Sequence, residues 1–200
     1  MTRPVFPRSW DALTKKANDI LSAHSRRTGW VPSLPVPIET IVESDFDLRI
    51  LWDDIEEPHG ALILAMLEPE QRRIVVNERH AEGILAAVGP FNFTLAHELG
   101  HWLFDAVHPD QGQLFDVSGE PVFCRGAHAL EESAKIREGN ADRFAASVLL
   151  PRHLMPMEDL VAMNHDELRC RAIEYGVSAQ ALVIRVQQLL NAHAAQLPLS

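Results

Sequence analysis

The sequence predicts an α+β fold in which a small antiparallel β-sheet packs on a mainly helical domain that ends in a pair of helices. Apolar residues recur with the period of a helix in the first 30 residues and again from about residue 92 to residue 192. Between these regions, residues 46–77 contain short apolar segments that are typical of strands. Strands followed by a run of helices indicate the α+β class.

The N-terminal region predicts a helix followed by a proline-rich linker. Ser9 is a suitable N-cap for a helix over residues 9–27, whose apolar positions recur every three or four residues. The Lys and Arg side chains of this helix are expected to face water. Thr28-Gly29 ends the helix, and residues 31–37 form the linker. Pro37 suits the first turn of a second, short helix.

Three short strands are expected next. Residues 46–50 alternate between apolar and charged side chains, as in a strand with one buried face. Residues 60–67 form a continuous apolar run, and residues 72–77 form a third strand. Residues 68–71, Glu-Pro-Glu-Gln, are expected to form a hairpin loop between the last two strands. The remaining periodic segments predict helices over residues 92–105, 131–150, 156–164, 166–175 and 178–192.

Composition and charge exclude several classes of protein. The 200 residues are 46% hydrophobic and 23% charged, which is usual for a globular chain. No apolar run approaches the roughly 20 residues that cross a bilayer, and the first residues do not resemble a secretory signal, so we expect no membrane association. Two cysteines, Cys124 and Cys170, fit a reducing compartment, and the cytoplasm is the expected location.

The net charge of −10 is unevenly distributed along the chain. Residues 1–30 hold six basic and two acidic side chains, so the negative charge is concentrated in residues 31–151. An acidic body repels the phosphate backbone of nucleic acids. Direct nucleic-acid binding is therefore disfavoured and would have to depend on a local basic patch.

The predicted helix 92–105 carries the chemically informative motif His97-Glu98-Leu99-Gly100-His101. Histidines four residues apart lie on one face of a helix, so both imidazoles can reach one zinc ion. Glu98 lies beside them and suits a general base that takes a proton from water. Gly100 costs about 1 kcal/mol of helix propensity relative to Ala, and the close approach of another backbone or of a substrate would explain it.

Two histidines leave a zinc ion incompletely coordinated, so a third ligand is expected. Glu138 and Asp142 lie four residues apart on the predicted helix 131–150 and therefore share a face. We expect Glu138 to bind the metal and Asp142 to accept a hydrogen bond from the far ring nitrogen of one ligand histidine. Asp105, four residues after His101, is either a second such carboxylate or an ordinary helix-end residue.

Two segments of the chain resemble the ImmA/IrrE-type metallopeptidases. Residues 93–102, FTLAHELGHW, closely resemble the F-T-L-A-H-E-L-G-H segment of that family. Residues 140–151, NADRFAASVLLP, are similar to its E-A-N/D-x-F-A-A-x-L-L-M-P segment, and the hairpin at residues 60–77 also looks like the family's. The resemblance covers about residues 60–180. One departure is Asn140, which stands where the family often has a second glutamate.

The resemblance implies a zinc-dependent endopeptidase with a gluzincin-like site. In this interpretation Glu98 is the catalytic general base and acid, and Asp142 orients a ligand. The predicted zinc ligands are His97, His101 and Glu138. Members of the family are associated with cleaving helix-turn-helix repressors, which releases mobile-element or stress-response genes. The resemblance thus implies a hydrolase whose partner is a repressor-type regulatory protein, with a role in transcription regulation and stress response.

The chain is expected to have three parts: residues 1–36, an N-terminal helix and linker; residues 37–155, the zinc metallopeptidase core; and residues 156–200, a C-terminal helical region. The last part resembles a helix-turn-helix, because Ala172, Gly176 and Leu182 stand where that motif needs a small residue, a turn glycine and a core apolar residue. Gln180 and Arg185 are expected on its exposed face. The alternative function is therefore a non-proteolytic zinc-containing regulatory or DNA-binding protein that uses this helix pair.

Some roles stay open at the level of the sequence. Cys124 precedes the helix of the third ligand and is either a further zinc ligand or a buried thiol. Cys170 lies on a predicted helix, and its side chain is expected in the hydrophobic core of the protein. The residue that stabilises the developing oxyanion is not identified, and the candidates are Tyr175, His128, His153 and Arg143.

Overall fold

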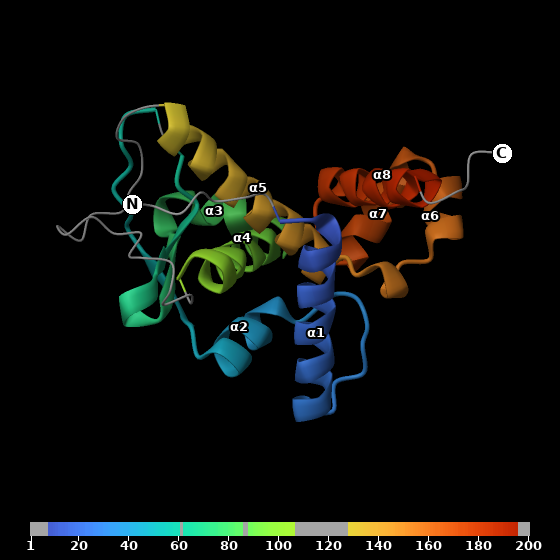
Figure 1. The fold of residues 1–200 in the computed structure, drawn as a ribbon, viewed down its shortest axis with the longest axis horizontal. Coiled ribbons are helices and arrows are strands. Elements are labelled where there is room, and N and C mark those ends of the chain that lie inside the picture. The colour runs from blue at the N-terminus through green and yellow to red at the C-terminus, as the bar shows by residue number, and fades with distance from the viewer. Residues whose placement is uncertain (1–7, 61, 86–87, 107–127, 196–200) are drawn as a thin grey trace.

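The computed structural model describes residues 8–60, 62–85, 88–106 and 128–195, and its architecture is α+β as predicted. The helices are α1 (Trp10–Thr28), α2 (Ile38–Phe46), α3 (Ala81–Leu85), α4 (Val88–His101), α5 (His128–Leu149), α6 (Met157–Ala162), α7 (His165–Glu174) and α8 (Ala179–Ala195). The strands are β1 (Arg49–Asp53), β2 (Ala65–Glu68) and β3 (Arg73–Asn77). Figure 1 shows the strands at one end of the molecule, α6–α8 at the other end, and α4 and α5 between them. No helix in the described residues is long and apolar enough to cross a bilayer.

Helix α1 begins and ends where the sequence predicts. The side chain of Ser9 accepts a hydrogen bond from the backbone N–H of Ala12, which caps the first turn. Gly29 adopts a left-handed conformation with φ of 76° and closes the last turn. The apolar stripe of α1 is buried, and one of its faces packs against α5.

The sheet is mixed, whereas the sequence predicted an antiparallel one. Its strand order is β1-β3-β2. β2 and β3 form the expected antiparallel hairpin around the turn Pro69–Gln71, but β1 lies on the other side of β3 and runs parallel to it. Period-2 alternation reports which face of a strand is buried and carries no information on the direction of its neighbour. The run at residues 60–67 becomes a strand only from Ala65, and Leu62 before it is 69% exposed.

Helices α4 and α5 pack closely at the centre of the core, and Gly100 allows their approach. A Cβ atom on Gly100 would lie 3.0 Å from the Cα of Ala141 and 3.3 Å from the ring of Phe144. The expectation that another backbone approaches Gly100 is therefore confirmed. Leu95, Leu99 and Phe144 are fully buried around this contact. The close approach brings the functional faces of the two helices together.

Helix α7 and the turn between α7 and α8 pack against the first half of α4. Gly176, in the turn between them, has φ of 65°, and its carbonyl accepts a hydrogen bond of 2.9 Å from the side chain of Asn92. A Cβ atom on Gly89 would lie 2.5 Å from the backbone of Val177 and Ser178. The turn of the helix pair thus sits directly on the backbone of α4.

Two expectations about side chains in this pair are wrong. Arg185 is 2% exposed and donates a hydrogen bond of 3.1 Å to the carbonyl of Leu150, so it is not on the exposed face of α8. It is covered because Trp10 of α1 packs over its guanidinium group. Cys170 is exposed on α7 instead of buried. The helical period alone did not predict either case, because burial depends on which neighbouring element covers a face.

Candidate metal centre

His97 and His101 on α4 face Glu138 on α5 across the contact made possible by Gly100. The Nε2 atoms of the two histidines lie 3.0 Å apart. The carboxylate oxygens of Glu138 lie 3.2 Å from Nε2 of His97 and 3.4 Å from Nε2 of His101. One donor atom from each of the three residues falls within 4.8 Å of the other two. The geometry therefore gathers three metal-ligating atoms at one point.

The separations between these atoms match the requirements of zinc. A tetrahedral zinc ion with bonds of about 2.0–2.1 Å holds its ligand atoms roughly 3.3 Å apart. The separations from His97 and His101 to Glu138, 3.2 and 3.4 Å, are close to that value, so the donors fit the ion without movement of either helix. Two imidazoles and one carboxylate form a donor set typical of catalytic zinc, in which a fourth position is left for water or substrate.

Each histidine is also held by a carboxylate at its other ring nitrogen. Nδ1 of His97 lies 2.9 Å from Oδ1 of Asp142, and Nδ1 of His101 lies 2.7 Å from Oδ2 of Asp105. When Nδ1 donates its hydrogen to the carboxylate, the lone pair of Nε2 points to the site, and the basicity of the imidazole rises. Asp142 thus lies where the sequence analysis expected a supporting carboxylate, and the structure brings Asp105 into the same position on the second histidine.

The backbone after His101 explains how Asp105 reaches its histidine. Helix α4 ends at His101 and continues directly into a π-helical turn over Trp102–Ala106. π-helical turns are wider than α-helical turns and are frequent at functional sites. The Asp105 side chain is 19% exposed and turned back to His101, instead of lying at a solvated helix end.

The charges in the centre shift the pKa values of its members in opposite directions. Burial lowers the pKa of His97, but hydrogen bonds to Asp142 and Glu138 outweigh this effect and raise it to about 9. The same balance, with Asp105 and Glu138, raises the pKa of His101 to about 10. Hydrogen bonds from His101 and His97 in turn lower the pKa of Glu138. Carboxylate and imidazoles therefore stabilise one another's charged forms.

Glu98 is on α4, and its side chain contacts strand β2 of the sheet. Burial raises the pKa of its carboxyl group, although the two histidines and a hydrogen bond from the backbone of Leu67 act in the other direction. Leu67 belongs to β2, so the carboxylate is held against the backbone of that strand. A raised pKa next to two histidines that could hold a metal ion is suited to a group that both accepts and returns a proton.

Residues 43–187 match the family described as the IrrE N-terminal-like domain, Peptidase_M78. This match covers well over half of the chain. The chain belongs to this family. Peptidase_M78 is a zinc metallopeptidase family, and the resemblance found in the sequence is thereby confirmed. No curated protein sequence matches the chain.

Among solved structures, one described as a Mycobacterium tuberculosis transcriptional regulator is similar to this Peptidase_M78 chain. The two share 14% sequence identity with a TM-score of 0.46, and the similarity covers 88% of this chain. This chain spans about half the length of that protein, because the similarity covers 50% of it.

Asn140, which departs from the pattern of the Peptidase_M78 family noted above, does not belong to the centre. Its side chain is 4% exposed, and its Oδ1 accepts a hydrogen bond of 3.0 Å from the backbone N–H of Arg8. Asn140 therefore holds the segment before α1 against α5. On α5, the carboxylates that contact the histidines of α4 are therefore those of Glu138 and Asp142.

The remaining candidates from the sequence have other surroundings or lie outside the described residues. Arg143 stacks over the ring of Trp10, where α5 meets α1. Tyr175 is buried in the turn between α7 and α8, and His153 is exposed. Cys124 and the side chain of His128 lie outside the described part of the chain. None of the described candidates is assigned to the oxyanion by these contacts.

Sequence reasoning missed one aromatic neighbour of the centre. The ring of Phe93 lies 6.4 Å from the ring of His97, measured between centroids. The signal was present, because Phe93 precedes His97 by four residues and so shares its helix face. Phe93 therefore extends the face of α4 that carries the two histidines with an apolar surface, one helical turn towards the N-terminus.

Proposed function

We propose that this chain is a zinc-dependent endopeptidase that hydrolyses peptide bonds in a protein substrate. The observation that carries the proposal is the convergence of His97, His101 and Glu138, with a carboxylate behind each histidine and Glu98 beside them. A structural zinc site is usually closed by four protein ligands, whereas the described part of the chain offers three at this point. Family membership supports the same chemistry.

In this proposal, each residue of the centre has a separate role in the hydrolysis of the peptide bond. His97, His101 and Glu138 would hold the zinc ion, which when bound would supply Lewis acidity towards a carbonyl group and towards water. Glu98 accepts the proton of the attacking water and delivers it to the leaving amine, for which a pKa raised by burial is favourable. Asp142 and Asp105 hold the Nδ1 hydrogens, so that both Nε2 atoms stay directed at the site.

The edge of the sheet offers a place for the substrate backbone. β2 is an edge strand of the sheet among the described residues, and the backbone of Leu67 in this strand contacts Glu98. An extended peptide can pair with such an edge through main-chain hydrogen bonds. We propose that the peptide lies along β2, which would place its scissile bond over the face of α4 that carries the histidines.

The substrate class follows from the resemblance of the chain to the ImmA/IrrE-type enzymes. We propose a regulatory protein of the helix-turn-helix repressor type, with a role in transcription regulation or in a stress response, in the cytoplasm. An endopeptidase acts on such a protein by cutting an accessible extended segment. The support for this step is the family alone, and it is tested separately from the chemistry.

The chemistry is tested by replacing Glu98 with an isosteric amide. Wild-type protein with zinc is incubated with a peptide library from a digested proteome, and new peptide ends are identified by mass spectrometry. We expect Glu98→Gln to lower cleavage by about 100-fold or more, because the proton acceptor is lost, while the zinc content stays the same. Glu43→Gln, an exposed neutralisation on α2, serves as the control and should cleave like the wild type.

Cleavage that is absent in the wild type, or that is unchanged in Glu98→Gln, would contradict the proposal. That outcome would favour the alternative, a non-proteolytic regulatory or DNA-binding protein. For the substrate class, the same measurement is repeated with purified helix-turn-helix repressors from the source genome. Cleavage of library peptides without cleavage of any repressor would retain the chemistry and overturn the substrate class.

A further inference from the structure

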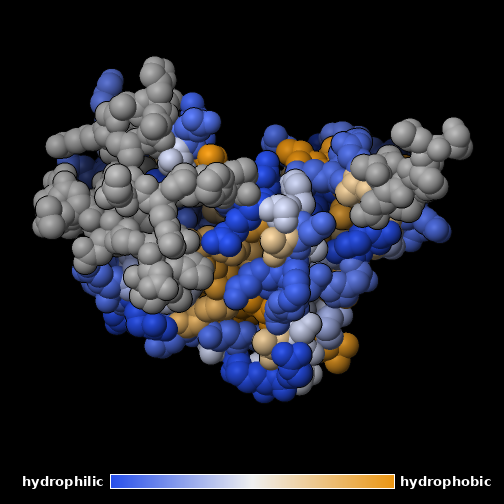
Figure 2. All heavy atoms as spheres, viewed as in Figure 1, coloured by the Kyte–Doolittle hydropathy of each residue, from blue (hydrophilic) through white to orange (hydrophobic). Residues whose placement is uncertain are grey.

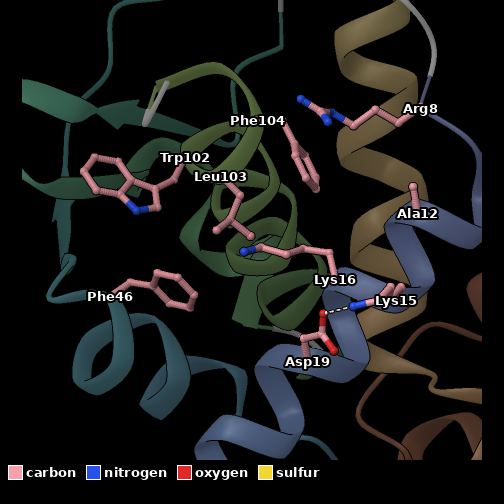
Figure 3. Close-up of a pocket in the computed structure, with 9 residues that line it drawn as sticks. All are labelled: Arg8, Ala12, Lys15, Lys16, Asp19, Phe46, Trp102, Leu103 and Phe104. Atoms are coloured by element: carbon pink, nitrogen blue, oxygen red, sulfur yellow. Dashed lines mark hydrogen bonds and ion pairs between the residues drawn. The ribbon is translucent and has the colours of Figure 1, made fainter. Parts of the chain in front are cut away.

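A cavity of about 550 Å³ lies at the end of α4, next to the metal centre in sequence and separate from it in its lining residues. Its volume lies within the range of ligand-binding pockets in proteins. Figure 3 shows that its walls come from the segment before α1, from α1, from the end of α2 and from the π-helical turn. The lining residues are Arg8, Ala12, Lys15, Lys16, Asp19, Phe46, Trp102, Leu103 and Phe104.

The floor of this cavity is apolar. It is formed by Phe46 and by Trp102, Leu103 and Phe104 of the π-helical turn. Figure 2 shows an apolar surface, bordered by hydrophilic side chains, in the region where α1 and α2 meet the end of α4. Large apolar side chains grouped in a hollow are a common recognition surface for an apolar group of a partner.

The rim of the cavity is basic. The guanidinium group of Arg8 lies 4.9 Å from the ring centroid of Phe104, and Lys16 extends from α1 towards Leu103 (Figure 3). Lys15 forms an ion pair of 2.8 Å with Asp19. Among the described residues, neither Arg8 nor Lys16 has a carboxylate partner. Two cations that form no ion pair within the described part of the chain therefore border an apolar floor.

The positive charge at this rim contrasts with the net negative charge of the protein. The chain carries a net charge of −10, so an acidic partner is repelled by most of its surface. Charge complementarity at a local basic rim overcomes this repulsion and fixes where such a partner binds. Nucleic acid fits less well, because the floor offers large apolar side chains and the rim also contains Asp19.

We propose that this cavity is a second substrate-binding site that holds an acidic segment of the protein substrate through one or more large apolar side chains. The proposal rests on the proposed peptidase function and names a feature of its substrate. The floor residues Trp102–Phe104 directly follow the ligand His101, and Asp105 in the same turn contacts that ligand. A segment bound in the cavity therefore raises the local concentration of the neighbouring cleavage site at the metal centre.

The binding experiment uses the full-length Glu98→Gln protein, so that the probe is not cut. The first probe is a short fluorescein-labelled peptide that alternates Asp or Glu with Leu or Phe. Its twin carries Lys or Arg in place of every acidic residue. Dissociation constants are measured by fluorescence anisotropy. We expect the acidic peptide to bind about tenfold or more tightly than the basic one, and the difference to shrink in high salt because surface charges are screened.

Charge reversals on α1 locate the binding site. Lys16→Glu is expected to weaken binding of the acidic peptide about tenfold. Arg26→Glu makes the same change of charge on the last turn of α1, at an exposed position outside the cavity lining, and should leave binding unchanged. Both positions are exposed, so both variants are expected to fold, which circular dichroism verifies.

Three results would overturn the proposal: equal affinity for the acidic and basic peptides, equal weakening by Lys16→Glu and Arg26→Glu, or a preference for a labelled DNA duplex over the acidic peptide. These outcomes do not depend on whether the protein cleaves peptides. In the active enzyme, Lys16→Glu should raise KM for a substrate that carries an acidic apolar segment and leave kcat unchanged. A loss of kcat at unchanged KM would contradict a binding role.

Discussion

At His97 and His101, burial and neighbouring carboxylates act on the imidazole pKa in opposite directions. The carboxylates dominate and raise the two pKa values to about 9 and about 10, from an ordinary value of 6.5. In the metal-free protein this interaction stabilises the fold fully below pH 6.5, and the stabilisation is lost as the pH rises through the folded-state values. A metal ion must displace the same protons, so protons and metal compete for the site.

Zinc binding is therefore expected to release close to two protons per chain at pH 7, one from each histidine. The affinity for zinc should rise with pH until about pH 9–10 and then level off. Isothermal titration calorimetry at pH 7 in two buffers of different ionisation enthalpy measures the released protons. A binding enthalpy that is the same in both buffers would contradict this account of the centre.

Asp105 and Asp142 are expected to support metal binding without touching the metal. Because each holds one Nδ1 hydrogen, Asp105→Asn or Asp142→Asn should weaken zinc affinity by about 10- to 100-fold. The measurement is a competition titration with a zinc chelator dye. Glu43→Gln, which removes an exposed charge outside the centre, should leave the affinity unchanged. Equal affinities for all three variants and the wild type would show that the two aspartates play no supporting role.

Much of the candidate centre could be predicted from local spacing, because helical periodicity fixes which side chains share a face. The pair His97 and His101 and the pair Glu138 and Asp142 both follow from this rule. The role of Asp105 could not be decided, since it depends on the π-helical turn after α4. The prediction that Arg185 is exposed was wrong for a related reason. Trp10, which packs over its guanidinium group, is distant in the sequence.

At the scale of secondary-structure elements, the distance between α4 and α5 determines whether the ligands can converge. That distance depends on Gly100, whose missing side chain leaves room for the backbone of Ala141. The type and order of the helices could be predicted from their apolar period, except for the short helix α3, which was not predicted. The direction of β1 could not, because strand pairing across β3 is a long-range choice that no local pattern encodes.

Gly100→Ala is expected to destabilise the protein by about 1 kcal/mol or more and to weaken zinc binding, because the added methyl group pushes α5 away from α4. Gly139→Ala on α5 is the matched control. Its Cβ would have no atom within 4 Å, so a gain in helix propensity should stabilise the protein by up to about 1 kcal/mol. Urea unfolding measures both variants. A stabilised Gly100→Ala variant with unchanged zinc affinity would refute the role of this contact.

At the scale of the whole molecule, the C-terminal helices are joined to α4, the helix that carries the two candidate metal-binding histidines. Gly89 and Asn92 on α4 contact the turn between α7 and α8, and Arg185 on α8 bonds to the backbone after α5. The family match runs through residue 187 and includes most of this region. The division of the chain at residues 36 and 155 remains a prediction, since composition and turn residues alone do not define which surfaces pack.

Gly89→Ala is expected to disturb this junction strongly. The added Cβ would lie 2.5 Å from backbone atoms of Val177 and Ser178, so either α4 or the helix pair must move. We expect a loss of unfolding free energy of about 2 kcal/mol or more. Gly83→Ala, with no atom within 4 Å of the added Cβ, is the control and should be neutral or slightly stabilising. Equal stability of the two variants would show that α4 does not support the pair.

The most direct test of the central claim is the zinc content of purified protein, measured by elemental analysis on the wild type, Glu138→Ala, Asn140→Ala and Glu98→Gln. We expect one zinc ion per chain in the wild type, its loss only in Glu138→Ala, and its retention in the other two variants. A wild type without zinc, or a zinc content that does not change in Glu138→Ala, would contradict a catalytic centre built from His97, His101 and Glu138.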